Sequence, residues 1–188
     1  MYLRVDDLRS GGREPGLAAW ARTDAGRLRL GRTSLQCIMV AAPSARLCCW
    51  RMTFEDIRSW LEHEGWPVEV VSGVTLRSSF QGSSRTFHLY VHLEPPFVTF
   101  AVIPFARLPT DPMGADAVAR RLLRLNREIN MAKFSADEDG DVVLSVEYRL
   151  ADLDPSEVRD AASVLSFYAD RHHAEVQELV AQANASSA

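Results

Sequence analysis

The sequence predicts an α+β domain in which an antiparallel sheet, formed by a meander and a hairpin, packs against three helices in the order α-β-β-β(-β)-α-β-β-α. Short runs rich in β-branched and aromatic residues follow one another over residues 68–105, separated by Gly, Ser and Pro. Three other segments place apolar residues at helical spacing. Because the strands come in clusters rather than alternating regularly with helices, an antiparallel sheet is favoured over a parallel one.

The 188 residues divide into two parts of opposite charge. Residues 1–51 hold nine arginines and four acidic residues, a net charge of +5, whereas residues 52–188 hold 12 basic and 21 acidic residues, a net charge of −9. All three cysteines lie in the first part, which shows no sustained helical or strand periodicity. We therefore expect residues 1–51 to be a disordered extension, or translated upstream DNA with the biological start at Met52, and residues 52–188 to be the folded domain.

Composition excludes several classes of protein. No apolar run approaches the roughly 20 residues of a membrane-spanning helix, and the apolar stretch at residues 35–42 comes too late for a secretory signal. No cysteine remains after residue 51 to form a disulfide framework. The charge of −9 disfavours nucleic-acid binding. We expect a cytoplasmic protein without membrane or nucleic-acid partners.

The first helix begins at Thr53, where a hydroxyl N-cap is followed three residues later by the carboxylate of Asp56. The helix ends before Gly65 and Pro67. Its apolar stripe requires a sheet to cover it and consists of Phe54, Ile57, Trp60 and Leu61.

Four strands of a meander follow, over residues 68–71, 74–80, 85–93 and 97–105. In the third strand, apolar residues alternate with His88, Tyr90 and His92, which indicates one buried face and one solvent-facing face. The fourth strand is apolar on both faces, so it is expected to be central or to meet a second layer, such as the other subunit of a dimer.

A second helix places Val118, Leu122, Leu125 and Ile129 on one face and Arg120, Arg124 and Arg127 on the other. Two strands, residues 132–138 and 141–150, are expected to form a hairpin around a type I′ turn at Asp139-Gly140. The last helix begins at Asp154-Pro155, with Glu157 completing the N-terminal pattern, and runs toward Leu179.

Three stretches of the sequence resemble the YbjN family: Glu64-Gly65-Trp66, residues 123–134 (LRLNREINMAKF) and the acidic hairpin over residues 137–144. The resemblance extends from about Met52 to Leu179. It implies a fold similar to that of type III secretion chaperones, small α+β domains that commonly dimerise and hold partner segments without catalysis.

Two groups of residues are candidate partner contacts. The fourth strand carries more apolar side chains than one core face can use, which makes Phe97, Phe100, Val102 and Phe105 candidates for an interface, with a two-layer core as the alternative. On the second helix, Arg120, Arg124 and Arg127 form either a solvated face or a docking surface for an acidic partner.

We predict no catalytic, cofactor-binding or metal-binding residues. His88 and His92 lie about 13 Å apart along a strand, too far to chelate one ion. His172 and His173 point about 100° apart on a helix and are expected to face solvent. The acidic run at residues 137–141 lacks the glycine and glutamate positions of a calcium loop, and no nucleophile elbow, dinucleotide fingerprint or P-loop occurs.

The leading hypothesis is therefore a non-catalytic chaperone-like or adaptor module that forms a homodimer and binds a protein client. The alternative is a regulatory sensor that binds a small ligand between sheet and helices. A catalytic role with carboxylates scattered along the sequence is the third hypothesis.

Overall fold

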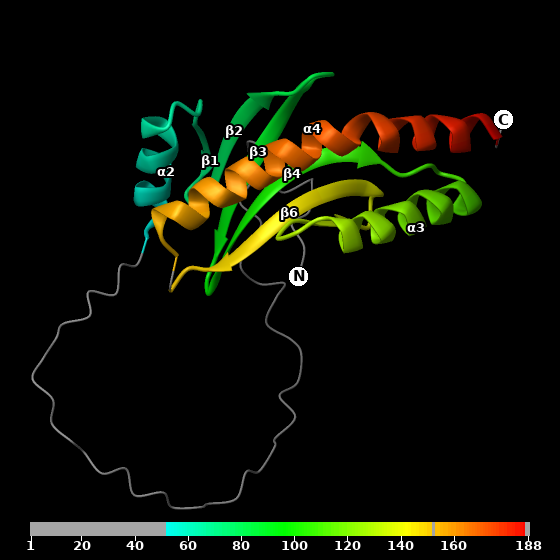
Figure 1. The fold of residues 1–188 in the computed structure, drawn as a ribbon. Helices are drawn as coiled ribbons and strands as arrows, with labels where there is room; N and C mark the ends of the chain where they lie inside the picture. Colours follow the sequence, from blue (N-terminus) through cyan, green and yellow to red (C-terminus); the bar gives the residue numbers. More distant parts are fainter. Residues whose placement is uncertain (1–51, 152, 187–188) are drawn as a thin grey trace, which may run out of the picture. The chain divides into compact units, whose positions relative to one another are not determined.

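The computed structural model describes residues 52–151 and 153–186, and the predictions made for residues 1–51 lie outside this part of the chain. The described residues form three helices and six strands in the predicted order (Figure 1). In chain order these are α2 (Phe54–His63), β1 (Glu69–Ser72), β2 (Thr75–Gln81), β3 (Thr86–Glu94), β4 (Phe97–Arg107), α3 (Pro112–Glu128), β5 (Lys133–Ala136), β6 (Asp141–Arg149) and α4 (Pro155–Ser186).

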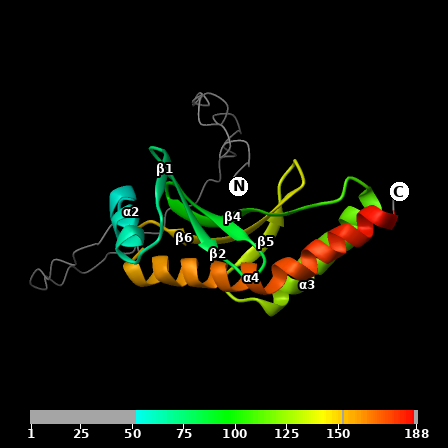
Figure 2. The same cartoon turned by 90° about the horizontal axis from the view of Figure 1, so that it is seen from above.

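The six strands form one antiparallel sheet in the order β1-β2-β3-β4-β6-β5. Each strand of the meander pairs with its neighbour in sequence, and the hairpin strand β6 joins the sheet beside β4. All three helices lie on one side of this sheet, with α4 crossing it, α2 near β1 and α3 alongside the C-terminal half of α4 (Figure 2). The predicted α+β class with an antiparallel sheet is confirmed.

Side chains placed before each helix satisfy its first free N–H groups. Thr53 Oγ1 accepts a hydrogen bond from the Asp56 N–H at 3.2 Å, while the Thr53 N–H donates to Asp56 Oδ2 at 2.8 Å. Asp111 Oδ2 caps α3 through the Gly114 N–H at 2.8 Å. The helix starts at Thr53 and at Asp154-Pro155 were therefore read correctly from local sequence.

The passage from α3 to β5 is held by two polar side chains. Asn126 Oδ1 accepts from the Phe134 N–H at 2.7 Å, and Asn126 Nδ2 donates to the Phe134 carbonyl at 3.0 Å. Lys133 Nζ donates to the carbonyls of Asn126 and Ile129, which are free at the end of the helix. These contacts attach the edge strand β5 to the helix that precedes it.

The hairpin between β5 and β6 is confirmed, but its turn differs from the predicted type I′. A type I′ turn needs positive φ at both central residues, and Gly140 has φ 79° whereas Asp139 does not have positive φ. The Gly140 N–H donates to the Asp137 carbonyl at 3.2 Å, and Asp137 Oδ1 accepts from the N–H groups of Asp139 and Asp141. The aspartate side chain stabilises a longer loop that ends in one left-handed glycine.

The main core lies between the sheet and the helices. Strands β3 and β4 direct Leu89, Val91 and Phe100 into it, and all three side chains are fully buried. Three alanines of α4, Ala161, Ala162 and Ala169, are buried over the sheet, so this helix can approach the strands closely.

A second, smaller apolar cluster lies on the other face of the sheet. It consists of Tyr90, Ala101, Ile103 and Val143. None of the helices in residues 52–151 and 153–186 covers this face (Figure 2). Tyr90, which was expected to face solvent, is 7% exposed because it belongs to this cluster.

Candidate functional site

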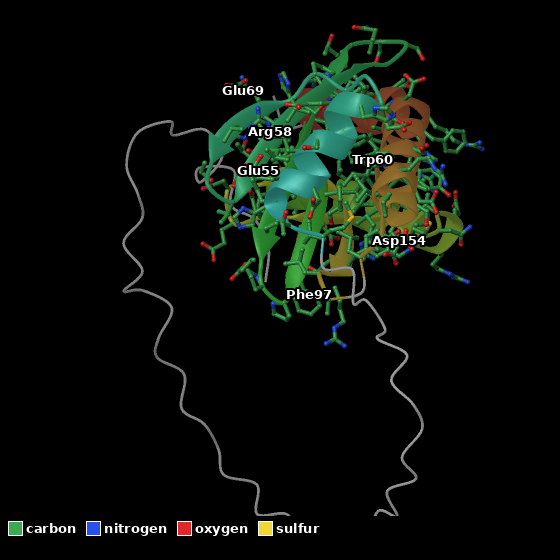
Figure 3. All side chains as sticks on the ribbon, turned by 90° about the vertical axis from the view of Figure 1, so that its left-hand side faces the viewer. Glu55, Arg58, Trp60, Glu69, Phe97 and Asp154 are labelled. Atoms are coloured by element: carbon green, nitrogen blue, oxygen red, sulfur yellow. The ribbon has the colours of Figure 1, made fainter. Side chains whose placement is uncertain are left out.

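A hollow of about 420 Å³ opens on the helix-free face of the sheet. Residues from β3, β4 and β6 and from the turn between β3 and β4 line it: His92, Glu94, Pro95, Pro96, Phe97, Thr99, Ala101, Val143, Ser145 and Glu147. Phe97 lies at one end of the sheet, as Figure 3 shows in a view from that end. The hollow therefore combines an apolar floor with polar walls.

The strand register explains why these side chains meet. Thr99 lies between His92 of β3 and Glu147 of β6 as a direct partner of both. Phe97 lies opposite Glu94. Because neighbouring strands are about 4.8 Å apart, side chains of one row on one face come within reach of the same bound group.

Two carboxylates give the hollow a negative charge. Glu94 and Glu147 are exposed, and within the described residues no hydrogen bond or ion pair engages either side chain. No arginine or lysine is among the described residues that line the hollow. His92 is half-buried, and its Nδ1 lies 2.8 Å from Thr75 Oγ1.

The candidate contacts predicted on the fourth strand lie on two different faces. Phe97 lines the hollow and is 40% exposed. Phe100, Val102 and Phe105 are buried in the main core beneath the helices. All three residues are therefore core residues. Alternation along β4 turns Phe100 and Val102 toward the helices, and Phe105 reaches the same side after the register shift between Val102 and Ala106.

Sequence reasoning missed the apolar residues of the helix-free face. Ala101 and Ile103 lie on β4 between the residues that were predicted, and Val143 lies on β6. The sequence did indicate a second apolar face of the sheet, since the fourth strand is apolar on both of its faces. Without the register of neighbouring strands, the sequence does not show which half of its side chains the helices cover.

The three arginines predicted on the second helix are exposed. Their helix, α3, lies on the helix side of the sheet (Figure 2), and none of the three lines the hollow. Arg120 forms an ion pair with Asp116 at 2.8 Å. Within the described residues no ion pair joins Arg124 or Arg127 to a carboxylate. The structure therefore does not bring the two predicted groups together.

His172 and His173 are both 8% exposed, so the expectation that they face solvent was wrong. The His173 ring contacts those of Phe87 and Phe105 edge-on, with centroids 5.1 and 5.6 Å away, and His172 stacks on Tyr168. Burial lowers the pKa of both histidines. They are components of the core under α4.

The contact between Ser84 and His173 lacks the geometry of a catalytic triad. Ser84 Oγ lies 3.2 Å from His173 Nδ1, but His173 Nε2 is buried without a hydrogen-bond partner among the described residues. A triad needs an acid on that second nitrogen, whereas Asp170 binds the backbone and side chain of Ser83. These contacts tie the turn between β2 and β3 to α4.

The described residues contain neither a metal-ligand cluster nor a membrane-spanning helix. No three His, Cys, Asp or Glu side chains in this part of the chain gather as a metal site would require. No helix there is both long enough and apolar enough to span a membrane.

One protein family matches more than half of this chain. A profile of the TY-Chap1 family, described as T3SS (YopN, CesT) and YbjN peptide-binding chaperone 1, matches residues 80–181. The crystal structure of YbjN from E. coli superposes with a TM-score of 0.52 and 16% identity, covering 66% of this chain and 93% of that one. This similarity shows a common fold.

A structure of the heterodimeric ExoU–SpcU complex from the type III secretion system of Pseudomonas aeruginosa also matches, with a TM-score of 0.44 and 25% identity. It covers 65% of this chain and 95% of that one. Among curated proteins, none matches the sequence significantly.

Proposed function

Because this chain belongs to the TY-Chap1 family of T3SS (YopN, CesT) and YbjN peptide-binding chaperones, we propose that it holds a segment of a protein client on the helix-free face of its sheet, without catalysis. The profile spans residues 80–181, which include all of the strands that form the hollow and its apolar floor. The resemblance found in the sequence is thereby confirmed, and the chain is a chaperone-like peptide-binding module. The identity of the client is the further step.

The choice of surface rests on the exposed residues of the hollow. Phe97 is 40% exposed, and Glu94 and Glu147 are exposed as well, on the face that no helix of residues 52–151 and 153–186 covers. The cluster formed by Tyr90, Ala101, Ile103 and Val143 lies on the same face but is itself only 0–7% exposed. A client segment lying along the start of β4 would contact Phe97 and the two carboxylates.

Site-specific photo-cross-linking tests this surface. A photo-reactive amino acid replaces Thr99 on the helix-free face, or Ser163 on the exposed side of α4 as the matched control. We expect a client to be cross-linked from position 99 in cells that make the full chain, and not from position 163. Equal cross-linking from both positions, or cross-linking from 163 alone, would place the client elsewhere.

We further propose that the protein forms a homodimer through its helix side. Leu123 on α3 is 66% exposed and Phe167 on α4 is 56% exposed, so the helices carry large apolar side chains that a second copy could cover. We expect Leu123→Glu to convert the dimer into a folded monomer in sedimentation-velocity experiments. A wild-type chain that sediments as a monomer at all concentrations would contradict the proposal.

The small-ligand alternative has no support. It required a cavity between sheet and helices, whereas the residues that line the hollow of about 420 Å³ lie on the opposite face of the sheet. A cytoplasmic location stays a prediction from the sequence.

A further inference from the structure

We propose that the hollow recognises an arginine side chain of the client segment, with its guanidinium paired to Glu94 and Glu147 and packed on the ring of Phe97. This inference rests on the proposed function, because it specifies the chemistry of the client at the same surface. It adds a preference for arginine in the client segment, which an apolar sheet face alone would not have.

The size and floor of the hollow fit side chains of an extended peptide. A volume of about 420 Å³ is near the lower end of the range for ligand pockets, roughly 300–1,000 Å³, and leaves room for a few side chains. Ala101 and Val143 line the hollow but are 0% and 5% exposed, so the apolar surface open to a ligand is the ring of Phe97. The aliphatic part of a long side chain can pack on this ring while its charged end reaches the carboxylates.

The charges of the walls favour a cation. Glu94 and Glu147 lie on different strands and line the same concave surface. Two negative charges in one concave site reinforce each other's electrostatic potential. Residues 52–188 as a whole also carry a net charge of −9. An acidic client segment would be repelled from this position.

No ion pair neutralises these carboxylates within the described residues. Arg149 lies opposite Phe97 on β6, on the face that carries Glu147, but it does not line the hollow. Within the described residues no ion pair joins Arg149 to Glu94 or to Glu147. Arg77, the nearest cation on β2, is already paired with Glu69.

The position of Phe97 favours arginine over lysine. Phe97 is the direct cross-strand partner of Glu94 and is 40% exposed. A guanidinium that reaches the Glu94 carboxylate can also stack on this ring, whereas an ammonium is a compact, strongly hydrated charge. The planar guanidinium of arginine can also donate two parallel N–H···O hydrogen bonds to one carboxylate.

The test is a selection from a random peptide library displayed on phage, with the full chain as bait. Three baits are compared: the wild type, Glu94→Gln with Glu147→Gln, and the control Glu64→Gln with Glu138→Gln. Glu64 and Glu138 are exposed and lie away from the hollow, so the control removes the same charge. We expect peptides selected by the wild type and by the control to be enriched in arginine beside apolar residues, and peptides selected by the hollow variant to lose this enrichment.

The other outcomes separate this inference from the proposed function. Apolar peptides selected without arginine enrichment would overturn the inference and leave client binding intact. If no peptide is selected by any bait, short-segment binding fails and the inference fails with it. If no peptide is selected and the hollow variant instead loses self-association in sedimentation experiments, the hollow is a contact between two copies and the inference is wrong.

The binding affinity of a selected peptide and of its variants then gives the size of the preference for arginine. We expect citrulline in place of its arginine to weaken binding to the wild type about fivefold, since each exposed ion pair contributes only modestly. Lysine should weaken binding to a smaller extent. The Glu94→Gln, Glu147→Gln variant should discriminate less between the arginine and citrulline peptides, because only the contact with Phe97 remains. Equal binding of both peptides by the wild type would overturn the inference.

Discussion

Phe97 and Phe100 lie on the same strand but on opposite faces of the sheet. Phe97 is 40% exposed at the hollow, whereas Phe100 is fully buried beneath the helices. The same substitution is therefore expected to have different consequences at the two positions, because a carboxylate is hydrated at one and desolvated at the other.

We predict that Phe100→Glu unfolds the domain or lowers its free energy of unfolding by more than about 4 kcal/mol, since it places an unpaired charge in the core. Phe97→Glu should remain folded, with a loss below about 1 kcal/mol. Thermal and urea unfolding followed by circular dichroism provide the measurement. A folded, stable Phe100→Glu protein would show that Phe100 is not a core residue.

His172 and His173 make the core sensitive to acid. Burial is the main cause that lowers the pKa of each; Arg85 lowers the pKa of His173 further, while Asp170 raises it. The pKa of His172 is raised by Glu175 and lowered by Arg171 and Arg121. The effect of Glu175 is smaller than that of burial, so the pKa of His172 is lowered as a whole. Both imidazoles therefore bind a proton less readily in the folded protein than in the unfolded chain.

We predict that stability falls as the pH drops below about 6.5, the ordinary histidine pKa. In this range the unfolded chain binds protons at both positions and the folded chain resists them, so protonation favours unfolding. Urea unfolding at pH 7.5 and pH 6.0 measures the effect above the range in which most carboxylates titrate. His173→Gln should reduce the pH dependence, and His63→Gln, at an exposed position, should leave it unchanged.

At the scale of the elements, Asn126 connects α3 to β5 as a strand partner would. Its side chain both donates to and accepts from the backbone of Phe134. Since β5 has only four residues and pairs on one side with β6, this bridge is a substantial part of what holds the edge strand.

We predict that Asn126→Ala lowers the free energy of unfolding by about 1–3 kcal/mol, because it leaves a part-buried N–H and carbonyl without their partner. Amide exchange should accelerate first in β5. Asn130→Ala is the matched control, since the Asn130 side chain is exposed, and it should change stability by less than about 0.5 kcal/mol. Equal effects of the two substitutions would refute the role of the bridge.

At the scale of the whole molecule, the domain has two unlike sides. The helices, among them α3 with its arginines, occupy one side of the sheet (Figure 2). Glu94 and Glu147, which line the hollow, belong to the other side. Contacts made on one side need not disturb contacts made on the other. The proposed homodimer and the proposed client site are therefore compatible in one assembly.

We predict that replacing Arg120, Arg124 and Arg127 together by Glu leaves the domain folded, because surface ion pairs contribute little to stability. Cross-linking of a client from position 99 should continue. Loss of this cross-linking in a folded protein would assign the client to the arginine face, and loss of the dimer alone would assign that face to self-association.

Much of this architecture could be predicted because its determinants are local in the chain. The caps at Thr53 and Asp154, the apolar stripes of the helices and the alternation in β3 depend on spacings of two to four residues. Such patterns identify an element wherever it lies in the fold. The α+β class and the order of elements followed from them.

The location of the candidate site was decided only by tertiary structure. The sequence shows that β4 is apolar on both faces, but the pairing of β4 with β3 and β6 determines that Phe100 and Val102 meet the helices while Phe97, Thr99 and Ala101 meet the hollow. The burial of His172 and His173 has the same origin, since helical spacing places them on neighbouring faces and the packing of α4 on the sheet buries both. Local spacing determines which residues share a face, and only the assembled layers determine what that face contacts.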